Sequence, residues 1–322
     1  MTVPTNTVTT TAAVGNREDL ANAIYDISPM DTPFLSEAKK SKATAVYHEW
    51  QTDALEAAGT NRQVEGDDAT ANTFSATTRV GNYCQISRKT VSVSGTQRSV
   101  DSAGRSDEFA YQVAKRGREI KRDMEYALTR NQASSSGGAT TARSLASLES
   151  WLSTNKTSVG TGVAQTTPGF SGGSVAAPTD STVLGAFTKA SLDDVIQKCW
   201  TQGGDPKTIM VGPFNRSAVS GFSGISTLQT DANSGQDVTL MGAVDFYKSN
   251  FGILKVVPNR FQRDETALVL DMEYVGVAML RDMEFDDLAK TGDSDKTLIT
   301  AEYTLEVNNE SASGKVTDCT TS

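Results

Sequence analysis

Residues 246–318 read FYKSNFGILKVVPNRFQRDETALVLDMEYVGVAMLRDMEFDDLAKTGDSDKTLITAEYTLEVNNESASGKVTD, and this stretch is the most informative part of the chain. The apolar side chains near its end occupy every second position: Ile299, Ala301, Tyr303, Leu305 and Val307. The positions between them are polar. A period of two is typical of a β-strand with one buried and one wet face. Further strands are predicted at 266–270 and 274–280.

The strongest helical pattern lies upstream, at residues 107–132. Ser106 is a candidate N-cap, and acidic residues follow it at the positive end of the helix dipole. Apolar residues and one glycine form a stripe at three- and four-residue steps: Phe109, Val113, Gly117, Ile120, Met124 and Leu128. Lys115, Arg118 and Arg122 form a separate basic stripe. This stripe has three interpretations: a solvated face or one ion-paired with Glu119 and Glu125, a partner for acidic loops of another subunit, or a DNA contact.

Several short motifs in the quoted stretch resemble those of the major capsid proteins of tailed bacteriophages with the Hong Kong 97-like fold. They are Phe251-Gly252, VVPNRF at 256–261, LVLD at 268–271, AKTGDS at 289–294 and EYTLEV at 302–307. Near the N-terminus, Ile27-Ser28-Pro29 and Thr32-Pro33-Phe34 are also similar to this family. The resemblance implies an α+β shell-forming protein with an N-terminal arm, an E-loop hairpin, a P-domain with a spine helix, and an A-domain.

The resemblance also implies a division of the chain. The expected parts are an N-terminal arm (1–42), an E-loop hairpin (43–96), a P-domain with the spine helix (97–152), a surface loop (153–188), an A-domain (189–265) and closing strands of the P-domain (266–322). Local patterns predict the hairpin strands at 43–50 and 83–94. They predict shorter helices at 17–25, 142–152, 189–201 and 214–221, and strands at 207–211, 244–247 and 253–257.

Such a protein works through its contact surfaces. Prolines force extended backbone around Phe34 and Leu35, which are therefore expected to anchor the arm on a neighbour. The predicted hairpin carries clustered charges, and charges at the rim of an interface fix its register. The candidates for contact between subunits are Phe34, Leu35, Arg62, Glu65, Asp67, Asp68, Arg79, Lys115, Arg118 and Arg122.

Motifs for catalysis and metal binding are poorly supported. His48 is the single histidine and lies in a predicted strand, so a structural role is favoured over a Ser-His-Asp site. Residues 169–173 (GFSGG) match G-x-S-x-G around Ser171, but the flanking sequence predicts a loop rather than the required strand and helix. The acidic residues at 282–295 lack the spacing of a calcium loop. No catalytic residue, cofactor or metal site is expected.

Composition limits the partners. The net charge of −9 argues against tight phosphate binding, so contact with packaged double-stranded DNA is expected to be weak. No apolar run approaches the ~20 residues that span a membrane. Cys84, Cys199 and Cys319 are far apart and form no C-x-x-C pair, which favours a reducing compartment.

The expected partners are therefore other copies of the chain, in hexamers and pentamers, together with a portal and decoration proteins. The short polar N-terminus favours a separate scaffolding protein. No lysine occurs between Gln51 and Arg88, so covalent cross-linking through a hairpin lysine is not expected. Assembly is expected in the host bacterial cytoplasm, and the product is the virion capsid. The alternatives are another phage structural protein, an encapsulin-like nanocompartment shell, and a hydrolase using Ser171 and His48.

Overall fold

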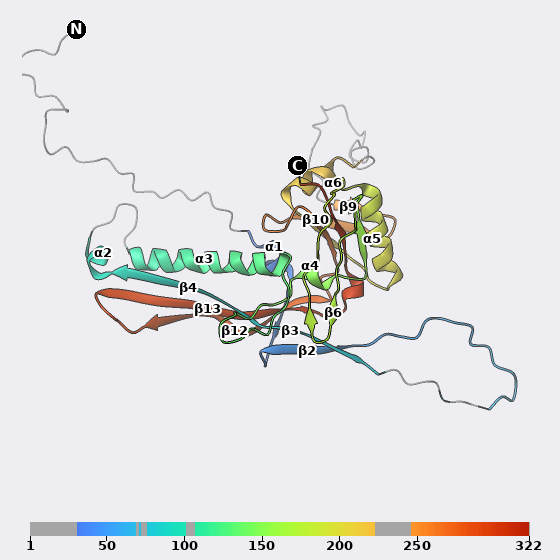
Figure 1. The fold of residues 1–322 in the computed structure, drawn as a ribbon, viewed down its shortest axis with the longest axis horizontal. Helices are drawn as coiled ribbons and strands as arrows, with labels where there is room; N and C mark the ends of the chain where they lie inside the picture. Colours follow the sequence, from blue (N-terminus) through green and yellow to red (C-terminus); the bar gives the residue numbers. More distant parts are fainter. Residues whose placement is uncertain (1–30, 69–70, 72–75, 101–106, 223–245, 322) are drawn as a thin grey trace, which may run out of the picture.

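The structure is a computed structural model that describes residues 31–68, 71, 76–100, 107–222 and 246–321. The helix predicted at 17–25 lies outside the described residues. Helices and sheets are mixed, as the α+β prediction requires. The described chain forms an elongated sheet with one long helix, a second sheet with two shorter helices, and a projecting hairpin (Figure 1).

The elongated sheet has four strands in the order β1 (Lys39–Lys42), β12 (Val275–Leu288), β13 (Ser294–Val307) and β4 (Gln85–Ser94). β13 pairs antiparallel with both β12 and β4, and β1 is a parallel edge strand on β12. The helix α3 (Glu108–Thr129) lies along this sheet and contacts β4 and β13.

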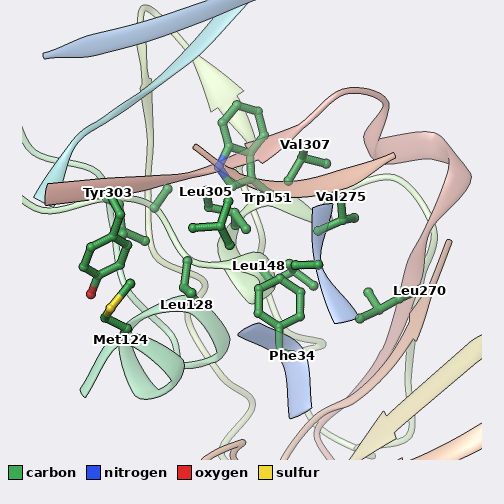
Figure 2. Packing of buried hydrophobic residues seen from close by; sticks show 14 of the residues in the cluster. Phe34, Met124, Leu128, Leu148, Trp151, Leu270, Val275, Tyr303, Leu305 and Val307 are labelled. Carbon is green, nitrogen blue, oxygen red and sulfur yellow. The ribbon is translucent and has the colours of Figure 1, made fainter. Parts of the chain in front are cut away.

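The ends of α3 differ slightly from the prediction. The Asp107 carboxylate, rather than Ser106, is the N-cap and accepts from the Phe109 N–H at 2.9 Å. The predicted stripe is confirmed in the second half, where Ile120, Met124 and Leu128 are buried against β13. Figure 2 shows Met124 and Leu128 beside Tyr303 and Leu305. In the first half, Phe109, Val113 and Gly117 are only half-buried.

The second sheet has six strands in the order β5 (Lys156–Ser158), β14 (Gly314–Thr317), β11 (Ala267–Leu270), β8 (Thr208–Val211), β10 (Ile253–Pro258) and β9 (Phe246–Lys248). Helix α5 (Lys189–Thr201) has the predicted bounds and packs on β14 and β5. Helix α6 (Pro213–Ser220) contacts β8 and β10.

The strands predicted at 266–270 and 274–280 were expected to complete one domain, the P-domain, but they lie in different sheets: β12 is in the elongated sheet and β11 is in the six-stranded sheet. β11 pairs with β8 and β14 in the six-stranded sheet. All four β11 side chains are buried because both faces of the strand are covered. Leu268 and Leu270 belong to the hydrophobic cluster under α3, while Ala267 and Val269 belong to the cluster under α5.

The prediction that one face of β13 is exposed to solvent is also wrong. Thr300, Glu302 and Thr304 are buried, like the apolar residues between them. Arg143 and Arg281 form ion pairs with Glu302 at 2.6 and 3.0 Å, and the Thr304 hydroxyl donates to the Tyr83 carbonyl. The pattern of alternation identified the strand, but neighbouring segments supply polar partners on its second face.

The hairpin forms from β2 (Tyr47–Thr52) and β3 (Thr78–Tyr83), whereas the predicted partner at 83–94 was wrong. β4 turns away from β2 because Val91 and Val93 are buried and the strand pairs with β13. Gly81 permits the close pairing, since a Cβ there would lie 2.7 Å from the His48 carbonyl oxygen. The hairpin loop projects away from the body (Figure 1).

The predicted surface loop at 153–188 is partly built into the body. It includes β5 and the small hairpin of β6 (Phe170–Ser171) and β7 (Ser174–Val175), and it buries Gln165 and Val175. The remaining short elements are α1 (Pro33–Glu37), α2 (Gly95–Ser99), α4 (Leu148–Trp151) and η1 (Glu310–Ala312). The helix predicted at 142–152 is therefore confined to α4.

The packing of α3 on the sheet predicts that Leu128→Ala lowers the free energy of unfolding by about 2–5 kcal/mol, because it leaves a cavity in a close-packed core. Urea denaturation measures the change. Lys121→Ala on the exposed face is the matched control, with an expected change within about 0.5 kcal/mol. Equal effects of the two substitutions would contradict this packing.

Candidate functional site

Phe34 and Leu35, predicted as anchors on a neighbour, lie in α1 and contact this chain's own body. The Phe34 side chain is completely buried in the cluster that also holds Leu148 and Leu270 (Figure 2). Leu35 is partly buried against the same cluster. The structure therefore uses Phe34 to fix the start of the described chain, and only part of Leu35 remains available to another subunit.

Glu125 holds α1 in place, a role that the sequence did not indicate. Its two carboxylate oxygens accept from the backbone N–H groups of Phe34 and Leu35, at 2.9 and 2.8 Å. The Asn259 side-chain amide donates to the same carboxylate at 2.7 Å. Burial raises the pKa of Glu125, while these three hydrogen bonds oppose the shift. The predicted ion-pair role of Glu125 on the basic stripe is thus wrong.

The hairpin carries five of the predicted contact residues. Arg62, Glu65, Asp67 and Asp68 are exposed in the loop beyond β2. Arg79 lies on β3 and pairs across the hairpin with Glu49 at 2.9 Å. Leu55 and Val64 in the loop are 99% and 79% exposed, so apolar side chains accompany the charges. A loop of this composition offers surface for a partner.

The base of the hairpin is fixed to the body. The buried Asn82 amide donates to the carbonyls of Ala146 and Leu305 and accepts from the Ala146 N–H, at 2.8–3.1 Å. The Tyr47 hydroxyl donates to the Gly173 carbonyl at 3.0 Å. These contacts make the hairpin base part of the body, so the direction in which the loop projects is set by the fold.

The basic stripe of α3 separates into two environments. Lys115 and Arg118 are exposed, whereas Arg122 is half-buried with its guanidinium 5.6 Å from the Phe261 ring centre. Glu119 pairs with Arg116 at 2.5 Å rather than with the stripe. The stripe is therefore exposed at Lys115 and Arg118 and partly covered at Arg122.

The candidate chemical groups are accounted for by structural contacts. His48 Nε2 lies 3.5 Å from a Glu306 carboxylate oxygen, and its ring lies beside Trp50. Ser171 lies in the β6–β7 hairpin, which lacks the strand-to-helix turn of a nucleophile elbow. Within the described ranges, no three His, Cys, Asp or Glu side chains come together as a metal site.

The cysteines are free and buried, and burial raises the pKa of Cys84 to about 11 and of Cys199 and Cys319 to about 12. Such thiols are poor nucleophiles because little thiolate forms at neutral pH. Among the described helices, none is both long enough and apolar enough to cross a bilayer.

A buried group of charges beneath the second sheet was also missed by sequence reasoning. The Lys315 ammonium is fully buried and donates to the Glu149 carbonyl at 2.7 Å and the Thr167 hydroxyl at 2.9 Å. The Glu149 carboxylate accepts from the Thr266 hydroxyl and lies 3.8 Å from the Arg263 guanidinium. The sequence around β14 gave no sign of this group, because it does not show which distant charged residues lie beside a buried lysine.

Asp318 fixes the 153–188 segment to the last strand. It has a positive φ of 62°, and its carboxylate accepts from the backbone N–H groups of Gln165 and Ser181 and from the Ser158 hydroxyl. These hydrogen bonds lower its pKa against the effect of burial. Asp318, directly after β14, therefore organises the 153–188 segment, whose sequence shows no clear pattern of helix or strand.

Comparison with known proteins gives one family match over nearly the whole chain. The family model described as SU10 major capsid protein matches residues 4–320. The major capsid protein of Escherichia phage Phieco32 is 42% identical over 120 residues, which cover 37% of this chain and 34% of that protein. The match thus spans about a third of the length of this curated relative.

Solved structures with the same fold include the capsid of cyanophage P-SCSP1u, with a TM-score of 0.63 and 9% identity over 98% of this chain and 96% of that one. A chain of Gordonia phage Cozz has a TM-score of 0.58 and 11% identity, over 98% of this chain and 96% of that one. A chain of the holo-SrpI encapsulin complex of Synechococcus elongatus has a TM-score of 0.52 and 12% identity, over 94% of this chain and 92% of that one. At these identities the likeness concerns the fold alone, and it confirms the predicted Hong Kong 97-like fold.

The Glu125 contacts predict that Glu125→Gln loosens α1. The amide of glutamine replaces an acceptor with a donor that faces a backbone N–H, and hydrogen bonds to a charged group contribute about 1.5–3 kcal/mol. Hydrogen exchange of the Phe34 and Leu35 amides is expected to accelerate at least about ten-fold. The control is Glu119→Gln, and unchanged protection in Glu125→Gln would contradict the assigned role.

The burial of Lys315 predicts an unusual pH dependence of stability. Desolvation lowers its pKa from 10.5 to about 8, so between these values the unfolded chain binds the extra proton. Stability contributed by Lys315 therefore rises with pH through this window, by about 3 kcal/mol in total. Urea unfolding from pH 7 to 10 should show this rise relative to Lys315→Met, and Lys121→Met serves as the exposed control. A difference between wild type and Lys315→Met that stays constant with pH would contradict the buried charge.

Proposed function

Because the chain belongs to the SU10 major capsid protein family, we propose that its copies assemble into hexamers and pentamers that form the icosahedral or prolate shell around phage genomic DNA. The family match over residues 4–320 is the observation that carries this proposal, because it spans both sheets, the long helix and the hairpin. The shell fold of the solved structures supports it independently.

The projecting elements suggest how the subunits join. In the proposed shell, the segment around 43–96 acts as an E-loop that reaches over a neighbour, and residues 1–42 act as an arm. The six-stranded sheet with α5 and α6 acts as the A-domain around the local symmetry axes. The expected contacts between subunits involve Arg62, Glu65, Asp67, Asp68, Arg79, Lys115, Arg118 and Arg122, with Leu35 at the arm.

Weak individual contacts suit this task. Closure of a cage makes many contacts cooperate, so each one need not reach the roughly 1,600 Å² of a standard stable interface. Exposed charge pairs contribute only about 0.2–1 kcal/mol each and are screened by salt. A shell assembled through such pairs is able to correct misplaced subunits before it closes.

Further partners follow from the proposed function. They are a portal, a scaffolding protein, decoration proteins, and packaged double-stranded DNA held by weak contact. Assembly is proposed to take place in the bacterial cytoplasm. We propose no catalytic role, because the contacts of His48 and the hairpin position of Ser171 give neither side chain the partners of a hydrolase.

An encapsulin-like compartment shell is the second candidate, since one solved structure of the same fold is an encapsulin complex. That likeness is one of fold at 12% identity, whereas the family match names a major capsid protein. Cargo distinguishes the two: a phage shell encloses DNA, and an encapsulin-like shell encloses a protein.

The proposal predicts that the purified chain forms closed shells or hexamer and pentamer rings, either alone or with the scaffolding protein of its phage. Electron microscopy and light scattering detect these assemblies. High salt should weaken the assembly, because the proposed contacts include exposed charges. A chain that stays monomeric at high concentration, with the scaffolding protein present, would contradict the proposal.

A further inference from the structure

The hairpin of β2 and β3 leaves the body at a defined angle, and we propose that Asn82 is the positioning residue that sets this angle. Because every copy in a shell repeats the same angle, Asn82 also makes the shells uniform in size. This second role rests on the proposed shell function, whereas the first concerns the single subunit.

Backbone pairing with the body does not fix the angle. Among the described strands, β2 and β3 pair only with each other, as a two-stranded sheet of their own. β3 ends at Tyr83 and β4 begins at Gln85, so a single residue, Cys84, joins the hairpin to the elongated sheet on this strand. Residues 43–46 join β1 to β2 on the other strand. Short connections between elements are where hinges form, so side-chain contacts have to hold the angle.

Apolar contact holds the hairpin against the body but does not orient it. Trp50 and Val80 are cross-strand neighbours that pack against the hydrophobic cluster under α3. The ring centre of Trp50 lies 5.4 Å from that of Trp151. In the described part of the chain, the buried N–H groups of both indoles have no hydrogen-bond partner. Because the hydrophobic effect is non-directional, this contact permits the stem of the hairpin to tilt.

Asn82 supplies the direction. Its side chain is fully buried on β3, close to the connection at Cys84. The amide group donates to the carbonyls of Ala146 and Leu305, at 3.1 and 3.0 Å. The amide oxygen accepts from the N–H groups of Ala146 and Tyr83, at 2.8 and 3.0 Å, so every donor and acceptor of the side chain is engaged. Since hydrogen bonds weaken steeply when they are bent, the three contacts with Ala146 and Leu305 fix β3 relative to the body.

The other polar contacts at the base of the hairpin are weaker. The Tyr47 hydroxyl donates one hydrogen bond to the Gly173 carbonyl at 3.0 Å, between β6 and β7. His48 Nε2 lies 3.5 Å from a Glu306 carboxylate oxygen, and the two side chains are 18% and 16% exposed. A partly exposed pair of this kind contributes little. Of the three hairpin residues, Asn82 alone is both fully buried and held by several hydrogen bonds.

The hairpin has room to tilt when this contact is lost. A cleft of about 770 Å³ separates the far part of the stem, at Thr52 and Thr78, from Phe170 and Glu310 of the body. The six residues of β2 span about 20 Å, so a tilt of about 10° moves the far end of the strand by about 3–4 Å. The cleft is large enough for such a movement.

A displacement of this size has consequences in a shell. The core of an interface between proteins is packed as densely as a protein interior, so it does not absorb a shift of several ångströms. A neighbour that follows the hairpin changes its own tilt instead, and in a closed shell this change is repeated at every copy. A fixed angle therefore gives shells of one size, and a variable angle gives shells of several sizes.

The first test measures the angle in the single subunit. Spin labels are attached at Gln51→Cys on β2 and Lys121→Cys on α3, and double electron–electron resonance gives the distance between them; the native cysteines are buried and stay unlabelled. Asn82→Ala in this background should broaden or shift the distance distribution by about 3 Å or more, the movement that a tilt of about 10° produces. Asn82→Ser, which keeps one hydroxyl donor, takes its place in the same measurement if the alanine variant does not fold.

Asn155→Ala is the matched control. Asn155 is also buried, and its amide also donates to two backbone carbonyls, those of Ser311 and Ser313, at 2.6 and 3.2 Å. Within the described structure, none of its hydrogen bonds reaches β2 or β3. This control should lower the stability of the subunit and leave the distance distribution unchanged.

The second test compares the assembled shells. Asn82→Ala is assembled with the scaffolding protein and imaged by electron microscopy. It should give shells of several diameters, whereas wild type and Asn155→Ala should give shells of one diameter.

The outcomes separate the positioning role from the shell function. An unchanged distance distribution in Asn82→Ala, or an equal change in Asn155→Ala, would overturn the positioning role. A changed distribution with shells of one unchanged diameter would overturn the link to shell size. Failure of the wild type to assemble, with the scaffolding protein present, would overturn the shell function; the distance measurement uses the unassembled subunit and would still decide the role of Asn82.

Discussion

The structure depends on three strands of the six-stranded sheet that are buried on both faces. β8, β10 and β11 alternate their side chains between two hydrophobic clusters: Met210, Val257 and Leu268 face the cluster under α3, while Ile209, Val256 and Val269 face the cluster under α5. Because the same backbone serves both clusters, the two sheets cannot move independently without opening a core. Fully buried strands of this kind read as continuous apolar runs, such as ALVL at 267–270.

The polar groups beside these strands also hold the parts of the chain in one arrangement. Lys315 lies on β14, next to β11, and its ammonium is held by Glu149 and Thr167 from the segment that precedes α5. Asp318 and Asn82 act in a similar way at other junctions, each with several hydrogen bonds to distant backbone. A buried polar group is costly unless it is fully hydrogen-bonded, so these contacts specify one arrangement of the chain. The hairpin and α3 are thereby held in defined directions, as a shell subunit needs.

The sequence predicted the elements whose signal is local. The bounds of α5 were correct, because apolar spacing and the Gly203-Gly204 stop lie within a few residues of one another. β13 was found from its alternation. The pairing of strands was less predictable: β3 has a weak pattern around Gly81-Asn82, and β4 was assigned to the hairpin although α3 and β13 cover it. Strand partners depend on contacts across many residues, and a pattern of period two does not contain that information.

The contact residues between subunits were also only partly predictable, because local patterns do not show which distant residues a side chain meets. Exposed charges such as Asp67 and Lys115 were identifiable from composition and helical spacing, whereas Phe34 was predicted to face a neighbour and instead fills this chain's own core. A proline-flanked aromatic residue anchors a chain segment, but the sequence does not say to which subunit. Glu125 shows the reverse case, since a carboxylate beside a basic stripe turned inward to hold two backbone amides.

The proposed function requires that copies of this chain form a shell in which projecting elements of one subunit lie on the next. A cryo-electron microscopy reconstruction of the assembled particle measures this most directly. We expect closed shells of hexamers and pentamers, with the hairpin loop of each copy lying on an adjacent copy. A reconstruction in which the chain forms no closed shell, or in which the hairpin loop contacts only its own subunit, would contradict it.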